Sequence, residues 1–327
     1  MKVLISTLPF SQNDCEPLEL LERSGVDYLI NPIGRKLEEG ELASLIGEFD
    51  ALIAGTEPIT DSVLGHATKL KLISRVGIGL DSVDLLSAER RGIAVSYTPD
   101  APSAAVAELT IGLMLALLRS THLSNMEMHR GKWHRHFGAR LSECVVGIIG
   151  AGRIGSKVAH HLSSFGCKKV MINDLDQSIK LNTGITWGWF DKEEIYREAD
   201  IISIHVPLTS LTRGMISRSE LEHMKSNALL INTSRGGIID EEDLVRVLNN
   251  GHLKGVAIDV FENEPYTGPL TLIDRCLLTA HMGSMSVDCR ARMEIEATEE
   301  TVRFLTGRPL THQVPREEYD NQRLAIR

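Results

Sequence analysis

The stretch CVVGIIGAGRIGSKVAHHL, residues 144–162, decides the fold class. It joins an apolar run to a segment of helical spacing through Gly150, Gly152 and Gly155, in the spacing GxGxxG. In such a loop the first glycine permits a tight turn, the second lets the backbone approach a pyrophosphate, and the third lets the helix pack closely on the strand. The helix N-terminus offers N–H groups and a positive dipole end to the anion. A purely structural glycine turn has the same letters, so the motif needs support from the residues that follow.

A carboxylate at the end of the next predicted strand gives that support. Asp174 follows the apolar run at 169–173 and lies 19 residues after Gly155, which is the spacing of an acid that hydrogen-bonds an adenosine ribose. The three residues after it, LDQ, include no Arg or Lys to bind a 2′-phosphate. We therefore predict NAD rather than NADP as the cofactor. An aspartate that only caps the following turn is the alternative.

Apolar runs alternate with helical segments on both sides of this loop. Five precede it, at 2–6, 26–30, 50–54, 71–76 and 93–97. Six more make up the second half, at 144–149, 168–173, 200–206, 227–233, 254–261 and 276–280. Strands that alternate with helices form parallel sheets. The sequence thus predicts an α/β protein with two doubly wound parallel sheets, of five and six strands.

Two long helical segments suggest how the halves are connected. The segment from Pro102 to about Arg130 has a very apolar middle, which predicts a helix buried inside the protein. An amphipathic segment from 286 to about 306 is expected to return to the first domain. We predict a discontinuous substrate domain of residues 1–97 and 286–327, with a dinucleotide-binding domain of residues 98–285 inserted into it.

Composition limits the classes of function. The 327 residues are 43% hydrophobic and 24% charged, which is ordinary for a soluble enzyme of about two domains. With 35 Lys and Arg against 44 Asp and Glu, the net charge of -9 opposes binding to nucleic acid. The longest apolar run, 109–118, is too short to span a bilayer, and the start MKVLISTLPF is typical of a strand rather than a secretion signal. We expect a cytoplasmic protein with no membrane partner.

The five cysteines do not indicate a functional role. They are scattered, with no CxxC and no Cys/His pair at metal-ligand spacing: Cys15, Cys144, Cys167, Cys276 and Cys289. We expect neither disulfides nor structural zinc, and the sequence suggests no other metal site. Use as small buried apolar residues is the plainest interpretation.

Polar residues follow four predicted strands of the second sheet. His205–Pro207 follow one strand, Thr233–Gly236 the next, Asp259 and then Glu264 a third, and His281 the last. In an open α/β sheet, ligands bind beyond the carboxyl ends of the strands. We therefore expect a cation, a carboxylate and an imidazole to converge beside the dinucleotide.

These side chains suit hydride transfer between a nicotinamide and a 2-oxo or 2-hydroxy acid. Arg235 would bind the substrate carboxylate and carbonyl oxygens through its planar guanidinium. His281 would give a proton to the carbonyl oxygen in reduction and take it back in oxidation. Glu264 would orient the imidazole and favour its protonated form. Taken singly, the three residues also fit a surface cation, a loop acid and a core histidine.

The chain resembles the D-isomer specific 2-hydroxyacid dehydrogenase family over nearly its whole length. The similar stretches are GAGRIGSKVA at 150–159, INTSRGGIIDEEDL at 231–244, GVAIDVFENEP at 255–265, TAHMGS at 279–284 and RVGIGLDSVD at 75–84. The resemblance implies a flavodoxin-like substrate domain and a Rossmann NAD-binding domain with a cleft between them. It also implies Arg235, Glu264 and His281 as the catalytic set.

The same resemblance assigns contacts to the cofactor and the substrate. Besides the three glycines of the loop, the cofactor contacts would be Arg153 and Ile154 at the pyrophosphate, Asp174 at the ribose, Val206 and Pro207 near the adenine, Thr233 and Asp259 near the carboxamide, and also Ser234 and Gly283. In the other domain, the backbone of Val76, Gly77 and Ile78 would bind the substrate carboxylate. Without the resemblance, that loop would be interpreted as an ordinary glycine turn.

Within the family, GKWHR at 131–135 and RVGIGLDSVD resemble the phosphoglycerate dehydrogenase branch. Its phosphate-binding arginines would correspond to Arg75 and Arg135. However, Ala54 stands where a further arginine is expected, and Ala280 replaces the proline that usually precedes the histidine. Because the chain ends 46 residues after His281, we expect a short form without the regulatory domain of long members and without feedback inhibition by an amino acid bound there.

The substrate remains open at this stage. The candidates are 3-phosphoglycerate, glycerate or hydroxypyruvate, glyoxylate and lactate. A hypothesis of another class is a non-catalytic, NAD-sensing binding protein, similar to the corepressors of the family. The resemblance also implies a homodimer formed through the cofactor domain and its long apolar helix.

Overall fold

The computed structural model describes residues 1–181 and 184–325, which group into two compact units. The first unit comprises Met1–Pro102 with Ser284–Arg327, and the second comprises Ser103–Gly283. The sequence-based boundaries differ from these at residues 98–102 and 284–285, which group with the first unit. Hydrogen bonds explain the first difference, since Thr98 N–H donates to Gly77 O (3.1 Å) and Gly77 N–H donates to Thr98 Oγ1 (2.8 Å).

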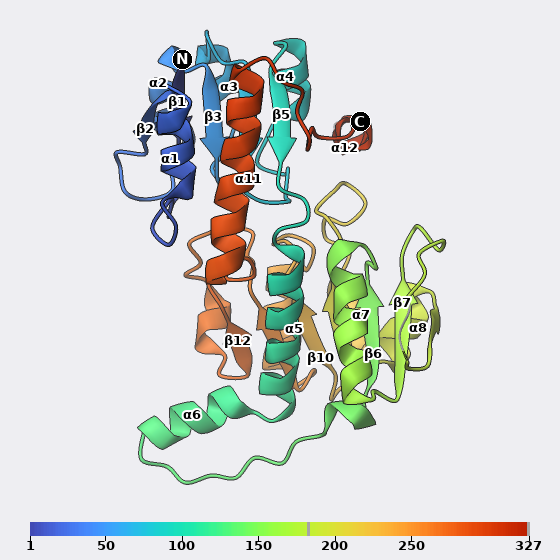
Figure 1. Cartoon of the computed structure of the whole chain (residues 1–327). Helices are drawn as coiled ribbons and strands as arrows, with labels where there is room; N and C mark the ends of the chain where they lie inside the picture. The colour runs from blue at the N-terminus through green and yellow to red at the C-terminus, as the bar shows by residue number, and fades with distance from the viewer. Residues whose placement is uncertain (182–183, 326–327) are drawn as a thin grey trace. The chain divides into compact units, whose positions relative to one another are not determined.

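The first unit is built on a five-stranded parallel sheet in the order β2-β1-β3-β4-β5 (Figure 1). Its strands are β1 Lys2–Ile5, β2 Asp27–Ile30, β3 Ala51–Ala54, β4 Leu72–Arg75 and β5 Ala94–Tyr97. All five coincide with predicted apolar runs. The order is that of the flavodoxin-like doubly wound fold, so the predicted class of this domain is confirmed.

Helices surround this sheet, and two of them come from the far end of the chain. They are α1 Glu16–Arg23, α2 Glu39–Leu45, α3 Asp61–His66, α4 Leu85–Arg90, α11 Val287–Leu305 and α12 Arg316–Ala325, with a 3-10 turn η1 at Ile46–Glu48. As predicted, α11 returns to the first unit, where it packs against α1, β3, β4 and β5. The sequence analysis did not predict α12, which packs against α4. The Gln322 side chain anchors it, because its amide donates to Val83 O and accepts from Leu85 N–H.

The second unit contains a seven-stranded parallel sheet in the order β12-β11-β10-β9-β6-β7-β8. Its strands are β6 Val145–Ile149, β7 Lys169–Asn173, β8 Trp187–Trp189, β9 Ile201–Ile204, β10 Leu229–Asn232, β11 Gly255–Ile258 and β12 Cys276–Leu278. Numbered from β6, the order 3-2-1-4-5-6-7 extends the Rossmann arrangement. The predicted fold is confirmed, but the predicted number of six strands is wrong. The missing strand is β8, which was not predicted because it is a three-residue, half-buried edge strand with the sequence WGW.

The strands of the second sheet bury side chains on both faces. In β10, Leu229 and Ile231 pack in a cluster with Met114 and Val158, whereas Leu230 packs in the opposite cluster with Leu244. Successive side chains of a strand point to opposite faces, so a sheet covered on both sides reads as a continuous apolar run. The covering helices are α5 Ser103–Leu118, α7 Arg153–Phe165, α8 Lys192–Glu198, α9 Arg218–His223 and α10 Glu241–Asn249, with 3-10 turns η2 at Leu141–Glu143 and η3 at Pro269–Leu272.

The long helix predicted from Pro102 to about Arg130 is in fact two helices. α5 ends at Leu118, Ser120 adopts a left-handed conformation with φ 50°, and α6 runs from Thr121 to His129. The two axes differ by 65°. No single described helix is long and apolar enough to cross a membrane; α5 and α6 reach that length and composition only as a bent pair. α5 is a core helix that packs on α7, β10 and β11.

A buried ion pair joins α11 to the N-terminal part of the first unit. The Arg290 guanidinium donates to Glu294 Oε1 (2.5 Å), to Thr7 Oγ1 (3.0 Å) and to Pro9 O. Glu294, which is 2% exposed, also accepts from Ser11 N–H (2.7 Å). Removing one partner of such a pair leaves an uncompensated buried charge.

We predict that Arg290→Met destabilises the first unit by about 3–5 kcal/mol. The matched control is Arg292→Met on the same helix. Its ion pair with Glu296 lies at the surface on the arginine side, where such pairs contribute less than about 1 kcal/mol. Urea unfolding followed by circular dichroism measures both variants. If both variants lost the same small amount of unfolding free energy, the assignment of Arg290 as the main buried cation of α11 would be contradicted.

Candidate active site

Close contacts explain two of the three glycines in the loop between β6 and α7. Gly150 has φ +95°, and a Cβ there would lie 2.5 Å from His205 O. A Cβ at Gly155 would lie 1.9 Å from Gly150 O. Both distances are far shorter than any real Cβ contact, so only glycine fits at either position. These contacts bring the loop, the start of α7 and the end of β9 together.

Gly152 has a different environment, and this difference supports a ligand. A Cβ at Gly152 would meet nothing within 4 Å. Gly152 is the N-cap of α7, and its cap makes no side-chain hydrogen bond. Of the residues carried over to the pyrophosphate, Arg153 is exposed and Ile154 half-buried in the first turn of this helix. An uncapped helix start beside open space fits the pyrophosphate of a dinucleotide.

Asp174 lies next to this loop. Its carboxylate accepts from Ala151 N–H (2.6 Å) and from Asp176 N–H (2.9 Å). It therefore caps the following turn and also binds the backbone of the glycine loop. The Ser178 hydroxyl donates to Asp176 and lowers the pKa of that carboxyl. Two carboxylates at this turn disfavour a 2′-phosphate.

The residues after β9 form the far side of the loop. A Cβ at Gly150 would lie 2.9 Å from Val206 Cγ1, and Pro207 follows with its carbonyl accepting from the Thr212 hydroxyl (2.6 Å). His205 Nε2 is 2.8 Å from Ser203 Oγ. Burial lowers the pKa of His205 to about 3. The His205 imidazole is therefore kept neutral by its burial.

The three predicted catalytic residues follow three neighbouring strands, β10, β11 and β12. After β10, the Asn232 side chain shapes the turn that carries Arg235: its amide donates to Arg235 O (2.8 Å), and its oxygen accepts from Ser234 N–H (3.0 Å). A Cβ at Gly236 would lie 2.0 Å from Phe261 C. The turns after β10 and β11 are therefore packed tightly against each other.

Glu264 and His281 are in direct contact. His281 Nδ1 lies 2.9 Å from Glu264 Oε2 and 3.1 Å from Glu264 Oε1. Phe261 N–H donates to Glu264 Oε1 (3.0 Å) and holds the carboxylate in place. Both side chains are half-buried. A carboxylate on Nδ1 selects the tautomer protonated at that nitrogen and leaves Nε2 for a substrate.

Asp259 fixes the turn on which His281 lies. Fully buried, it accepts from Met282 N–H (2.7 Å), Gly283 N–H (2.9 Å) and Thr279 Oγ1 (2.6 Å). Its backbone carbonyl accepts from His281 N–H (2.8 Å). Asp259 was expected beside the cofactor carboxamide, and the hydrogen bonds give it a positioning role as well. They hold His281 in a left-handed conformation, φ 52°.

The sequence analysis missed side chains that support this arrangement. Asn232 is the clearest, since a polar residue at the carboxyl end of a buried strand is a signal that was available. The Thr110 hydroxyl, 2.9 Å from Thr233 Oγ1, lies on the apolar helix α5. Nothing in the sequence connects it to a residue 123 positions away. The Thr279 hydroxyl likewise hydrogen-bonds to Asp259, and the Ser203 hydroxyl to His205.

The candidate substrate loop belongs to the first unit. It follows β4, with Gly77 at φ +140°. Val76 N–H donates to Ala54 O (2.9 Å), and Gly77 N–H donates to Thr98 Oγ1. Among the described residues, no hydrogen-bond acceptor is present for Ile78 N–H. Of the three backbone N–H groups expected to bind a carboxylate, those of Val76 and Gly77 are thus paired within the first unit.

The two candidate phosphate-binding arginines have different surroundings. Arg75 ends β4, is 4% exposed, and donates from its guanidinium to Val76 O (2.5 Å). Arg135 is exposed on the segment 130–140, which leads through η2 to the start of β6 (Figure 1). The catalytic set lies at the carboxyl ends of the strands. Within the second unit, the structure therefore does not bring Arg135 together with Arg235, Glu264 and His281.

Comparisons with known proteins agree with this geometry. The sequence model described as "D-isomer specific 2-hydroxyacid dehydrogenase, NAD binding domain" matches residues 111–283. The chain is 36% identical over 276 residues to a hydroxypyruvate reductase of Thermotoga maritima, covering 82% of this chain and 89% of that protein. It is 36% identical over 277 residues to a D-3-phosphoglycerate dehydrogenase of Methanocaldococcus jannaschii, covering 83% of this chain but only 52%, about half, of the relative.

A solved structure extends the likeness to both units. The TT0316 protein from Thermus thermophilus superposes with a TM-score of 0.86 at 33% identity, over 96% of this chain and all of that one. The chain belongs to the D-isomer specific 2-hydroxyacid dehydrogenase family. It is thus an NAD-dependent oxidoreductase of the 2-hydroxyacid class.

The glycine loop gives a paired prediction. Gly155→Ala should lose NADH binding and about 1–3 kcal/mol or more of stability, because the added methyl group would overlap Gly150 O. Gly152→Ala should keep the melting temperature but bind NADH more weakly, because its methyl group occupies open space at the helix start. Calorimetric titration with NADH and thermal unfolding measure both effects. Wild-type affinity in both variants would show that the cofactor binds elsewhere.

Proposed function

We propose that the protein reduces a small, unphosphorylated 2-oxo acid to the D-2-hydroxy acid with NADH. The observation that carries this proposal is the contact between Glu264, which follows β11, and His281, which follows β12. β11 lies between β12 and β10, the strand that precedes Arg235. A general acid, its orienting carboxylate and an anion-binding guanidinium are the groups that the reduction of a 2-oxo acid needs.

The chain's own residues would act as follows. Arg235 binds the substrate carboxylate through its guanidinium. Glu264 orients the ring and stabilises its positively charged form, in which His281 holds a proton at Nε2 as well as at Nδ1. His281 gives the Nε2 proton to the carbonyl oxygen and becomes neutral. The loop after β6 would hold NADH, which when bound would be the source of the hydride for the carbonyl carbon. In oxidation of the hydroxy acid, His281 takes the hydroxyl proton.

Three features favour a substrate without phosphate. Ala54 occupies the position of an expected arginine, Arg75 is buried with its guanidinium bonded to the neighbouring backbone, and Arg135 is remote from the catalytic set within its unit. The alternative, 3-phosphoglycerate and its oxo acid, is supported by the similarity to the Methanocaldococcus jannaschii protein. Hydroxypyruvate and glyoxylate are substrates without phosphate and fit these features. The lactate pair fits them too, because lactate differs from glycerate only in lacking the hydroxyl group at C3.

NADH oxidation with a panel of 2-oxo acids tests the function. We expect turnover of hydroxypyruvate or glyoxylate, with a higher kcat/KM for hydroxypyruvate than for its 3-phosphate. His281→Ala should lower kcat by roughly 10²–10⁴ without changing the NADH affinity. The control His66→Ala alters an exposed histidine of α3 in the first unit and should leave turnover unchanged. Tight NADH binding with no turnover of any substrate would favour the NAD-sensing alternative instead.

We also propose a cytoplasmic homodimer that binds neither nucleic acid nor membranes. The most exposed apolar side chains of this region lie not on α5, most of which is buried, but on α6 and the segment after it. Met128, Trp133 and Phe137 are 51%, 77% and 98% exposed there. Clustered exposed apolar side chains often mark an interface. The net charge of -9 supports the absence of a polyanionic partner.

Sedimentation analysis tests the dimer. We predict a dimer for the natural sequence and a monomer for the double variant Trp133→Asp/Phe137→Asp. The control is Leu211→Asp, which alters an apolar side chain that is 75% exposed and lies away from α6. A monomer before any substitution, or an unchanged dimer in the double variant, would contradict this interface.

A further inference from the structure

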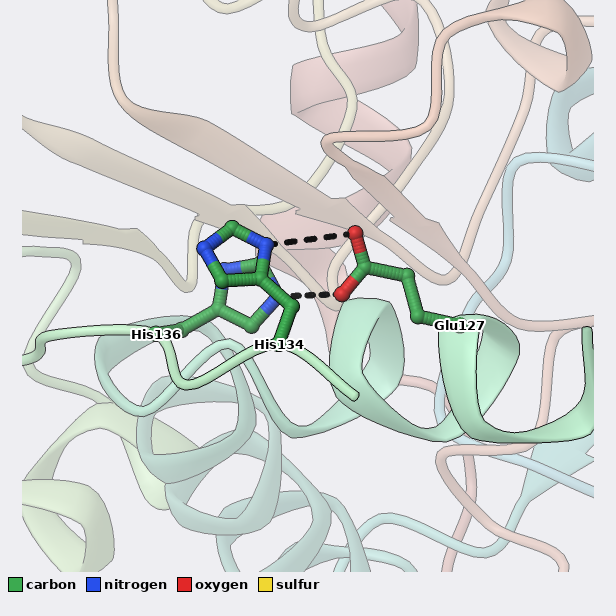
Figure 2. A group of neighbouring side chains, drawn as sticks. All are labelled: Glu127, His134 and His136. Atoms are coloured by element: carbon green, nitrogen blue, oxygen red, sulfur yellow. Dashed lines mark hydrogen bonds and ion pairs between the residues drawn. The ribbon is translucent and has the colours of Figure 1, made fainter. Parts of the chain in front are cut away.

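Two histidines and a glutamate meet in the second unit, away from the active site (Figure 2). Glu127 lies on α6, two residues before its end at His129. The chain then reverses at Gly131, which has φ +71°, and Lys132 N–H donates to Glu127 O (2.9 Å). The segment that follows brings His134 and His136 back beside the carboxylate.

The side chains form a compact group. His136 Nε2 lies 2.9 Å from Glu127 Oε2, and His134 Nδ1 lies 3.5 Å from Glu127 Oε1. The two imidazole rings lie over each other with centroids 4.3 Å apart, and both face the carboxylate in Figure 2. One nitrogen from each ring and one carboxylate oxygen all lie within 4.8 Å of one another.

We propose that Glu127, His134 and His136 bind one divalent ion of the late first-row transition series, such as Zn²⁺. Bonds of about 2.0–2.2 Å place the ligand atoms of a tetrahedral site roughly 3.4 Å apart. The ligand atoms, which lie within 4.8 Å of one another, therefore need to approach by at most about 1.4 Å. The His134 side chain is 61% exposed, so it has room to make this movement.

The donor types determine which ions fit. Imidazole nitrogens suit Zn²⁺, Ni²⁺ and Cu²⁺, whereas Mg²⁺ and Ca²⁺ require mostly oxygen ligands. The segment also carries Arg130, Lys132, Arg135 and Arg140, and their charges oppose an ion held by a single carboxylate alone. Binding thus depends on the two imidazoles. Three protein ligands leave a fourth position for water.

The competing account is a cluster held by hydrogen bonds alone. In it, protons on the imidazoles occupy the place of the ion, and the bond from His136 lowers the pKa of Glu127. The two accounts differ in what happens when a metal ion is added, because an ion replaces those protons. Binding would tie the segment 130–140, which contains no helix or strand, to α6.

Metal titration of the full chain without an affinity tag, after chelator treatment, tests the site. We expect one Zn²⁺ per chain by calorimetry, and Co²⁺ should give the absorption of a tetrahedral site with nitrogen and oxygen ligands. Glu127→Gln and the double variant His134→Gln/His136→Gln should each bind at least about tenfold more weakly. The control is His66→Gln, an exposed histidine on α3 of the first unit, which should bind like the unaltered chain.

NADH affinity provides the fold check, because none of these residues lies in the proposed active site. Unchanged NADH binding in a variant that has lost Zn²⁺ supports the assignment whatever the substrate is. No stoichiometric binding by the unaltered chain, or equal affinity in the double variant and the unaltered chain, overturns it.

Discussion

The active site depends on the buried carboxylate of Asp259. Three donors converge on it from the turn after β12, two of them backbone N–H groups. Because a buried carboxylate without hydrogen bonds is very costly, this turn has one favourable arrangement. His281 lies inside the turn, in a backbone conformation that residues other than glycine rarely adopt. The position of the imidazole is therefore a consequence of the hydrogen bonds that the turn makes to Asp259.

The second constraint is the close approach of glycine backbones. Gly150 and Gly155 bring β6, α7 and the end of β9 to distances that exclude a side chain, and Gly236 does the same for the turns after β10 and β11. Parallel strands place all these turns at one edge. The open position at Gly152 and the contact between Glu264 and His281 therefore both lie at the carboxyl edge of one sheet.

Much of this arrangement could be predicted, since apolar runs and strand ends are local in sequence. Strands buried on both faces read as uninterrupted apolar runs, and the turns after them carry Arg235, Glu264 and His281. What could not be predicted depends on contacts distant in sequence or on single backbone angles. β8 is too short to give a pattern, and the break at Ser120 has no Pro or Gly to mark it.

The cluster of Glu127, His134 and His136 shows the same limit. No metal site was expected from the sequence, and the pair of histidines separated by one residue does not show which carboxylate joins it. Only the reversal at Gly131 brings a helix residue next to the two histidines. The boundary after the first segment of the first unit lies at Pro102 rather than at residue 97. The reason is the pair of hydrogen bonds between Thr98 and Gly77, and not a local feature of residues 98–102.

The most direct test of the active-site account is to follow the hydride itself. The protein is incubated with hydroxypyruvate and with NADH in which deuterium replaces both hydrogens at C4 of the nicotinamide. The product is then examined by NMR. Direct transfer at the carboxyl edge of the second sheet predicts glycerate with one deuterium at C2 and none lost to water. Glycerate with hydrogen at C2, or deuterium that appears in the solvent, would contradict it.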